Sequence, residues 1–128
     1  MDKAVHEWLE KAEEDFHVAQ SLLRLRKRPA HNAVCFHAQQ TVEKLLKALL
    51  EKHKIRIPKI HDLPSLLDLC TNHYPLISTL RDDLVRLSVY AVEFRYPGES
   101  ATAEDAKIAL KMAKQARSEL RDWILAPL

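Results

Sequence analysis

The stretch Cys35-Phe36-His37-Ala38-Gln39-Gln40-Thr41-Val42-Glu43-Lys44-Leu45-Leu46-Lys47-Ala48-Leu49-Leu50 decides the fold of this chain. Its apolar residues return every three or four positions, which is the period of an amphipathic α-helix. When successive residues are placed about 100° apart around the helix axis, these apolar residues lie on one side of the helix. The stretch therefore predicts a helix over residues 30–54 with one apolar arc: Val34, Ala38, Val42, Leu45, Leu46 and Leu49.

The helical period continues outward from this stretch in both directions. It predicts further helices over residues 2–26, 63–73, 76–93 and 102–125. Asp2 is a suitable N-cap for the first, and Thr102-Ala103-Glu104-Asp105 has the form of a capping box for the last. We expect an all-α protein: residues 1–128 form one domain, an antiparallel up-and-down four-helix bundle with an additional short helix. Alternating directions would place His61 toward one end of the bundle and residues 95–101 at the other.

Composition excludes several classes of protein. The chain has 128 residues and a single glycine, so neither a P-loop nor a glycine-rich dinucleotide turn is present. No metal-ligand spacing occurs, and we expect no metal and no cofactor. A net charge of +2 is too small to imply nucleic-acid binding by itself.

The cysteines and the hydropathy of the chain indicate its cellular location. Cys35 and Cys70 lie in apolar helical patterns, so we expect buried free thiols and not a disulfide framework. No apolar run approaches the roughly 20 residues that a membrane span needs. We expect a cytoplasmic protein without membrane contact.

Two basic clusters are candidate phosphate contacts. One contains Arg24, Arg26, Lys27 and Arg28, with His31 close behind. Cations at a helix end are favoured by the dipole, but they also contact nucleic-acid phosphates. The other cluster is a linker that is either solvated or bound to an acidic partner or a nucleic acid: Lys52, His53, Lys54, Arg56, Lys59 and His61.

A polar stripe accompanies the apolar arc of the central helix: His37, Gln40, Lys44, Lys47 and Glu51. A solvated face is one interpretation of the stripe. A homodimer contact through His37 and Gln40 is the other, with His37 at a partly buried interface where its charge matters. Asp15 on the first helix is a candidate for a structural ion pair inside the bundle.

The segment Arg95-Tyr96-Pro97 follows the helix predicted over residues 76–93. An arginine at such a turn either stabilises the helix end or presents a fork of donors to phosphate or carboxylate.

Several segments together resemble the HEPN family, and specifically members that carry Arg-Tyr-Pro. The similarity rests on Trp8, Ala12 and Asp15, on Phe36 with Ala38-Gln39-Gln40, on Glu43-Lys44 and Lys47-Ala48, on His61-Asp62-Leu63, and on Arg95-Tyr96-Pro97. This resemblance implies a helical bundle, often a homodimer. It also implies a toxin–antitoxin pair with a separately encoded minimal nucleotidyltransferase. Active members are metal-independent RNases in which about four to six residues separate an arginine from a proton-transferring histidine.

The chain departs from that RNase motif, because no histidine follows Arg95. Two displaced pairs, each with four residues between its members, are Arg26 with His31 and Arg56 with His61. We therefore expect a protein that binds nucleotide or RNA phosphate through Arg95 and Tyr96, with Lys44 and Lys47 as second choices. The alternatives are a metal-independent endoribonuclease toxin that uses a displaced pair, and a purely structural homodimer.

Overall fold

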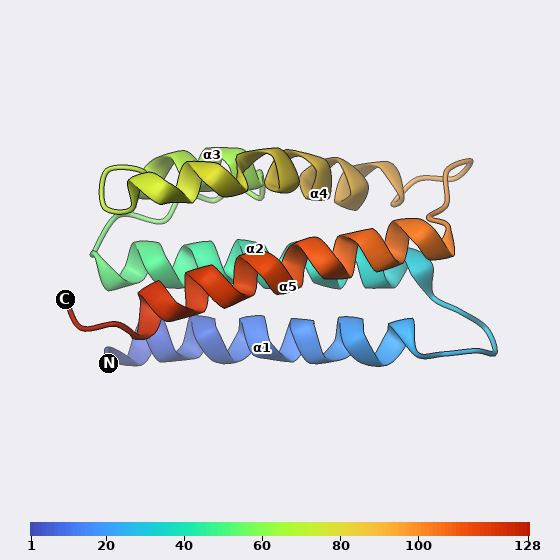
Figure 1. Ribbon diagram of the computed structural model, residues 1–128, viewed down its shortest axis with the longest axis horizontal. Helices are drawn as coiled ribbons and strands as arrows, with labels where there is room; N and C mark the ends of the chain where they lie inside the picture. Colours follow the sequence, from blue (N-terminus) through green and yellow to red (C-terminus); the bar gives the residue numbers. More distant parts are fainter.

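The structure, a computed structural model, describes residues 1–128 and contains only helices. Four long helices alternate in direction along the bundle (Figure 1). The all-α bundle with an additional short helix is therefore confirmed. The elements in chain order are α1 (Lys3–Leu23), α2 (His31–Lys52), α3 (Leu63–Cys70), the 3₁₀ helix η1 (Pro75–Leu80), α4 (Arg81–Glu93) and α5 (Ala103–Leu125).

Helix α2 lies at the centre of the molecule. It shares the middle layer with α5, while α1 lies on one side of this layer and α3 and α4 lie on the other (Figure 1). Its carboxyl-terminal half is buried nearly all round, including the fully buried Leu45, Leu46 and Leu50. Helix α5 turns small residues toward the core, which lets neighbouring helices approach closely: Ala106, Ala109, Ala113 and Ala116.

Local hydrogen bonds set the ends of the helices as the sequence predicted. The Asp2 carboxylate accepts from the backbone N–H of Ala4, and Thr102 and Asp105 form the reciprocal capping box. Gly98, in the turn between α4 and α5, has a φ of +96° that favours glycine.

The helix predicted over residues 76–93 begins as η1 and continues as α4. In η1, the Ser78 hydroxyl donates to the Pro75 carbonyl and the Thr79 hydroxyl donates to the Leu76 carbonyl. Such side-chain bonds to nearby backbone compete with α-helical pairing, in line with the tighter winding of these residues.

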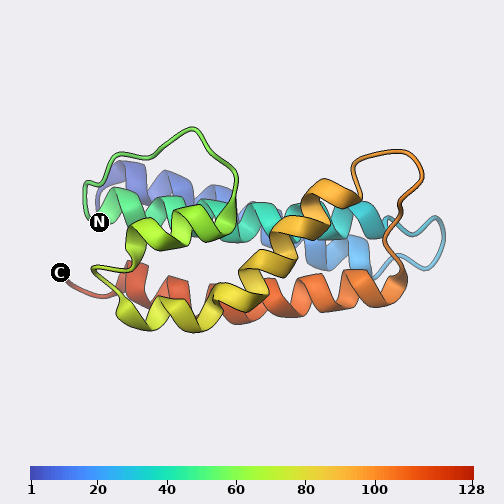
Figure 2. The same ribbon diagram turned by 90° about the horizontal axis from the view of Figure 1, so that it is seen from above.

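The segment between α2 and α3 corrects the expected position of His61. It turns at Lys54, whose φ of 55° is left-handed, and then runs back beside α2 (Figure 2). Three isoleucines of this segment pack against the core, which explains why it lies along the bundle: Ile55, Ile57 and Ile60. His61 consequently lies beside the middle of α2, and not at the end of the bundle.

Both cysteines are buried and unpaired, as predicted. Burial, reinforced by the charge of Asp105, raises the pKa of the Cys35 thiol to about 12. Burial alone raises the pKa of Cys70 to about 12. None of the helices is long and apolar enough to cross a membrane.

Candidate functional site

A cleft of about 400 Å³ opens between the amino-terminal half of α2 and the carboxyl-terminal half of α4. The returning linker closes one side of it with His61 and Asp62. The turn after α4 contributes Arg95. The full lining is Phe36, Gln39, Gln40, His61, Asp62, Ser88, Ala91, Val92 and Arg95.

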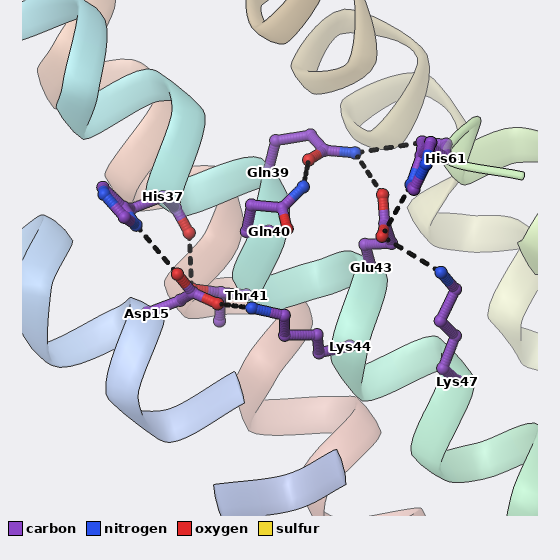
Figure 3. A network of polar contacts seen from close by, with 9 residues as sticks. All are labelled: Asp15, His37, Gln39, Gln40, Thr41, Glu43, Lys44, Lys47 and His61. Atoms are coloured by element: carbon purple, nitrogen blue, oxygen red, sulfur yellow. Dashed lines mark hydrogen bonds and ion pairs between the residues drawn. The ribbon is translucent and has the colours of Figure 1, made fainter. Parts of the chain in front are cut away.

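Next to His61 lies a buried ion pair between Glu43 and Lys47 of α2 (Figure 3). The Glu43 and Lys47 side chains are only 4% and 8% exposed, and Lys47 Nζ lies 3.1 Å from Glu43 Oε2. The Lys47 ammonium also lies 5.6 Å from the centre of the Trp8 ring. Because two charges removed from water need close partners, this pair is tied to the helical packing around it.

The same carboxylate holds His61. The His61 Nδ1 atom lies 3.1 Å from Glu43 Oε2, although the histidine side chain itself is 78% exposed. A carboxylate paired with lysine accepts hydrogen bonds, so Nδ1 supplies the proton of this contact. The His61 Nε2 atom is then free to exchange a hydrogen bond or a proton with a ligand.

Two glutamines connect the cleft to this carboxylate. Gln39 Nε2 donates to the His61 carbonyl at 3.0 Å and to Glu43 Oε1 at 3.2 Å. Gln39 Oε1 in turn accepts from Gln40 Nε2 at 2.8 Å. These bonds fix the orientation of both amides and fasten the linker to α2.

A second network joins α2 to α1, and it contains the predicted structural ion pair of Asp15 (Figure 3). His37 Nδ1 lies 2.8 Å from Asp15 Oδ1, and Lys44 pairs with the other carboxylate oxygen. The Thr41 hydroxyl donates to the His37 carbonyl at 2.8 Å. His37 and Lys44 therefore contact α1 and do not line the cleft.

These contacts correct the interpretation of the polar stripe on α2 as a solvated face. Lys47 is buried, and His37, Gln40, Lys44 and Glu51 are only partly exposed. The reason is the central position of α2, which is covered by α1 on one side and by the returning linker on another.

Arg95 and Tyr96 occupy different surroundings. Arg95 lines the cleft, is exposed and forms no ion pair, so its guanidinium is available to a ligand. Tyr96 is exposed at the next position and is not part of the cleft lining.

The cleft contains neither of the displaced Arg–His pairs as a whole. Arg56 is exposed and does not line the cleft with His61, and neither Arg26 nor His31 belongs to it. The cleft instead brings together His61 and Arg95, which lie 34 positions apart in the sequence.

Part of the basic linker has a structural role. Lys52 Nζ donates to the carbonyls of Trp123 at 2.5 Å and Ala126 at 2.6 Å, at the end of α5. Burial lowers the pKa of Lys52. His53 Nε2 lies 2.7 Å from the Tyr74 hydroxyl. The loop that contains Arg24 and Arg28 is exposed.

Sequence reasoning missed Phe36 and Ser88 as cleft residues, and Gln39 and Glu43 as buried polar groups. The spacing of Gln39, Glu43 and Lys47, each four apart, was the available signal. On an isolated helix the same spacing also describes a surface ion pair, so only the burial distinguishes the two.

Comparison with known proteins supports this architecture. The HEPN domain family matches residues 5–123. The crystal structure of TT1696 from Thermus thermophilus superimposes with a TM-score of 0.82 at 26% identity, covering 96% of this chain and 99% of that one. The structure of ST0689, an archaeal HEPN homologue, gives a TM-score of 0.76 at 23% identity, covering 97% and 99%.

No curated protein matches the chain. The family match nevertheless extends across all four long helices and both sides of the cleft. The chain therefore belongs to the HEPN domain family.

Proposed function

We propose that this protein binds a nucleotide or an RNA phosphate in the cleft between α2 and α4. It does so as the HEPN member of a toxin–antitoxin-like pair, with a separately encoded minimal nucleotidyltransferase as its partner. Residues 1–128 act as one domain of a cytoplasmic homodimer. The partner and the homodimer rest on the resemblance to the family, and the cytoplasmic setting rests on the two free cysteines and on the lack of a long apolar run.

The unpaired guanidinium of Arg95 at the cleft carries this proposal. Arginine presents several N–H donors in a planar fork that matches two phosphate oxygens. His61 and Gln40 add hydrogen-bonding groups to the same lining, and the exposed ring of Phe36 offers a surface on which a base can stack. The cleft therefore combines a positive charge for phosphate, hydrogen-bonding side chains and an aromatic ring for stacking, which are the features that nucleotide recognition uses.

Tyr96, Lys44 and Lys47 are expected to contribute less to ligand binding than Arg95. Tyr96 is exposed next to Arg95 and supplies a ring or hydroxyl at the edge of the site. Lys44 and Lys47 already neutralise Asp15 and Glu43, so a phosphate would have to compete with these carboxylates.

Titration of the purified protein with ATP and with a short RNA tests this assignment. We expect Arg95→Ala to weaken binding at least about tenfold, which corresponds to about 1.4 kcal/mol. Arg56→Ala is the matched control, because Arg56 is an exposed arginine outside the cleft. Equal affinities for wild type and Arg95→Ala would reject the role of Arg95.

The presence of His61 and Arg95 in one cleft favours a second candidate function, metal-independent cleavage of RNA. In such a reaction His61 Nε2 removes the proton of a ribose 2′-hydroxyl. The 2′-oxygen attacks phosphorus, the P–O5′ bond breaks, and the leaving oxygen takes a proton from water. Arg95 stabilises the extra negative charge on phosphorus oxygens in the transition state.

Incubation with total RNA in the presence of a metal chelator separates the two functions. Cleavage that is lost in both His61→Ala and Arg95→Ala would establish the ribonuclease. Cleavage that is lost in both Arg26→Ala and His31→Ala, or in both Arg56→Ala and His61→Ala, would instead assign that displaced pair. Absence of cleavage together with tight nucleotide binding supports the binding function. Absence of both leaves the purely structural homodimer.

A further inference from the structure

The amide of Gln40 lines the cleft, and the chain itself uses only part of it. Gln40 Nε2 donates one proton to Gln39 Oε1 at 2.8 Å. A primary amide has two donor protons and one acceptor oxygen. The second proton and the carbonyl oxygen of Gln40 form no hydrogen bond within the chain. Gln40 therefore offers one donor and one acceptor to a molecule in the cleft.

The buried carboxylate of Glu43 sets the orientation of this amide (Figure 3). Glu43 pairs with Lys47 and accepts hydrogen bonds, so Gln39 turns its Nε2 atom toward Glu43 Oε1. The same Nε2 atom donates to the His61 carbonyl. Gln39 Oε1 is then left facing Gln40, and only the Nε2 atom of Gln40 can donate to it. Each amide thus has one permitted orientation, and a ligand meets Gln40 already oriented.

An aromatic ring stands one helical turn before Gln40. Phe36 and Gln40 are four positions apart on α2, so they share a face and lie about 6 Å apart along the axis. The Phe36 ring contacts the His37 ring edge-on, with ring centres 5.2 Å apart. His37 is itself bound to Asp15, which restricts the Phe36 ring as well. A planar base that stacks on Phe36 brings its edge toward Gln40.

The free donor and acceptor of Gln40 match one edge of adenine. On this edge the N6 amine of adenine donates and its N7 atom accepts, which is the pattern that glutamine recognises with two hydrogen bonds. Guanine has two acceptors there, O6 and N7, so the Gln40 carbonyl oxygen would face another acceptor. Cytosine and uracil have no N7 atom and form at most one of the two bonds.

The carboxylates beside the cleft do not favour guanine instead. Recognition of the N1–H and N2–H donors of guanine takes both oxygens of one carboxylate. Glu43 is buried and already accepts from Gln39 and Lys47. Asp62 caps α3, and its Oδ2 atom accepts from the backbone N–H and the hydroxyl of Ser65. Neither carboxylate therefore has two free oxygens.

We infer that the cleft is selective for adenine, with Gln40 as the residue that determines the base, Phe36 as the stacking surface and Arg95 as the phosphate contact. This inference rests on the proposed function, because it needs a nucleotide in the cleft. The beginning of α2 and the end of α4 lie at the same end of the bundle, so a phosphate at Arg95 places the base near Phe36 (Figure 1). A volume of about 400 Å³ is within the range of ligand pockets.

Calorimetric titration of the full chain with AMP and with GMP tests the base preference. We expect the wild type to bind AMP at least about tenfold more tightly than GMP, because a two-bond contact distinguishes bases by about this factor. Gln40→Met removes the donor and the acceptor, so it should bring the two affinities within about twofold of each other. Equal affinities in the wild type, or an unchanged ratio in Gln40→Met, would overturn the inference.

Two further variants separate the base contact from other effects. Gln115→Met is the matched control, because Gln115 is an exposed glutamine of α5 outside the cleft, and it should leave both affinities unchanged. Arg95→Ala should weaken AMP and GMP by the same factor and so keep their ratio. A ratio that depends on Arg95 and not on Gln40 would overturn the role of Gln40. Far-UV circular dichroism of each variant checks that it is folded.

An analogue of AMP tests the edge of the base. In 7-deaza-AMP a C–H group replaces the N7 acceptor. We expect the wild type to bind it at least about threefold less tightly than AMP, which is the loss of one hydrogen bond. Gln40→Met should bind the two nucleotides alike. A wild type that binds both equally would overturn the two-bond contact.

Gln39→Met tests the fixed orientation. Without the Gln39 amide, Gln40 is free to rotate, so the preference for AMP should fall although the groups that contact the base are still present. Gln39 is buried, so urea unfolding of this variant accompanies the titration. A folded Gln39→Met variant with the full preference would overturn the fixed orientation.

These outcomes are distinguishable from failure of the proposed function. Binding of AMP and GMP that depends on Arg95 but shows no base preference would overturn the adenine selectivity and leave the proposed function intact. Absence of binding by every nucleotide would reject both.

Hexamers of oligo(A) and oligo(U) identify the source of the adenine. Tighter binding of oligo(A) than of AMP would assign a strand of RNA as the ligand, and equal or weaker binding would assign a free adenine nucleotide. Preference for oligo(U) over oligo(A) would overturn the inference.

Discussion

Replacement of Glu43 by glutamine removes the negative charge of the buried pair while keeping the shape of the side chain. The lysine left behind is 8% exposed and has no other carboxylate partner. Removing one member of a buried ion pair costs about 3–5 kcal/mol. The Trp8 ring near the ammonium offsets about 1 kcal/mol of this loss. We therefore expect Glu43→Gln to lower the free energy of unfolding by about 2–4 kcal/mol.

Urea unfolding followed by far-UV circular dichroism measures this difference, provided that the m-values agree. Glu13→Gln is the matched control. Glu13 and Arg117 are paired at 2.7 Å, but their side chains are 31% and 26% exposed. Glu13 accepts several hydrogen bonds from Arg117 and also lies 3.4 Å from Arg121, but these side chains keep contact with water, so its contribution is about 1 kcal/mol and smaller than that of the buried pair.

A double variant tests the physical reason for the loss. Glu43→Gln combined with Lys47→Met leaves no unpaired buried charge, so we expect it to recover at least half of the lost stability. Glu43→Gln could lower the free energy of unfolding by no more than Glu13→Gln does. Lys47 would then reach water in the variant, and our account of the buried pair would be wrong. Absence of recovery in the double variant would contradict it as well.

Two further predictions concern stability. Leu45 is fully buried, so Leu45→Ala should cost about 2–5 kcal/mol in urea melts, and a loss below about 0.5 kcal/mol would contradict its place in the core. Burial, His73 and Lys52 together lower the pKa of His53 below its ordinary 6.5. The unfolded chain therefore binds this proton more readily, and unfolding free energy falls as pH drops through 6.5. His53→Gln should show a smaller decline from about pH 8 to about pH 5, and an unchanged pH profile would contradict this cause.

The sequence by itself determined the helices and their ends. Helical periodicity located all the long helices, because the period of apolar residues follows directly from the geometry of the α-helix. Asp2 and Thr102 identified two helix starts, since side-chain capping depends only on neighbours in the sequence. The segments that carry Trp8, Gln39 and Arg95 also indicated the HEPN family before any contact was known.

The tertiary structure decided which polar residues form the candidate site. Periodicity assigns a residue to a face of its helix, but it does not say what covers that face. The polar stripe of α2 is largely covered because α1 and a returning linker pack against it, and the linker returns because its isoleucines bury against the core. Burial turns Glu43 and Lys47 into an internal ion pair, and the same return brings His61 to the cleft that Arg95 lines. The contacts that cover α2 and that bring His61 near Arg95 join residues distant in the sequence, so they depend on packing and not on local pattern.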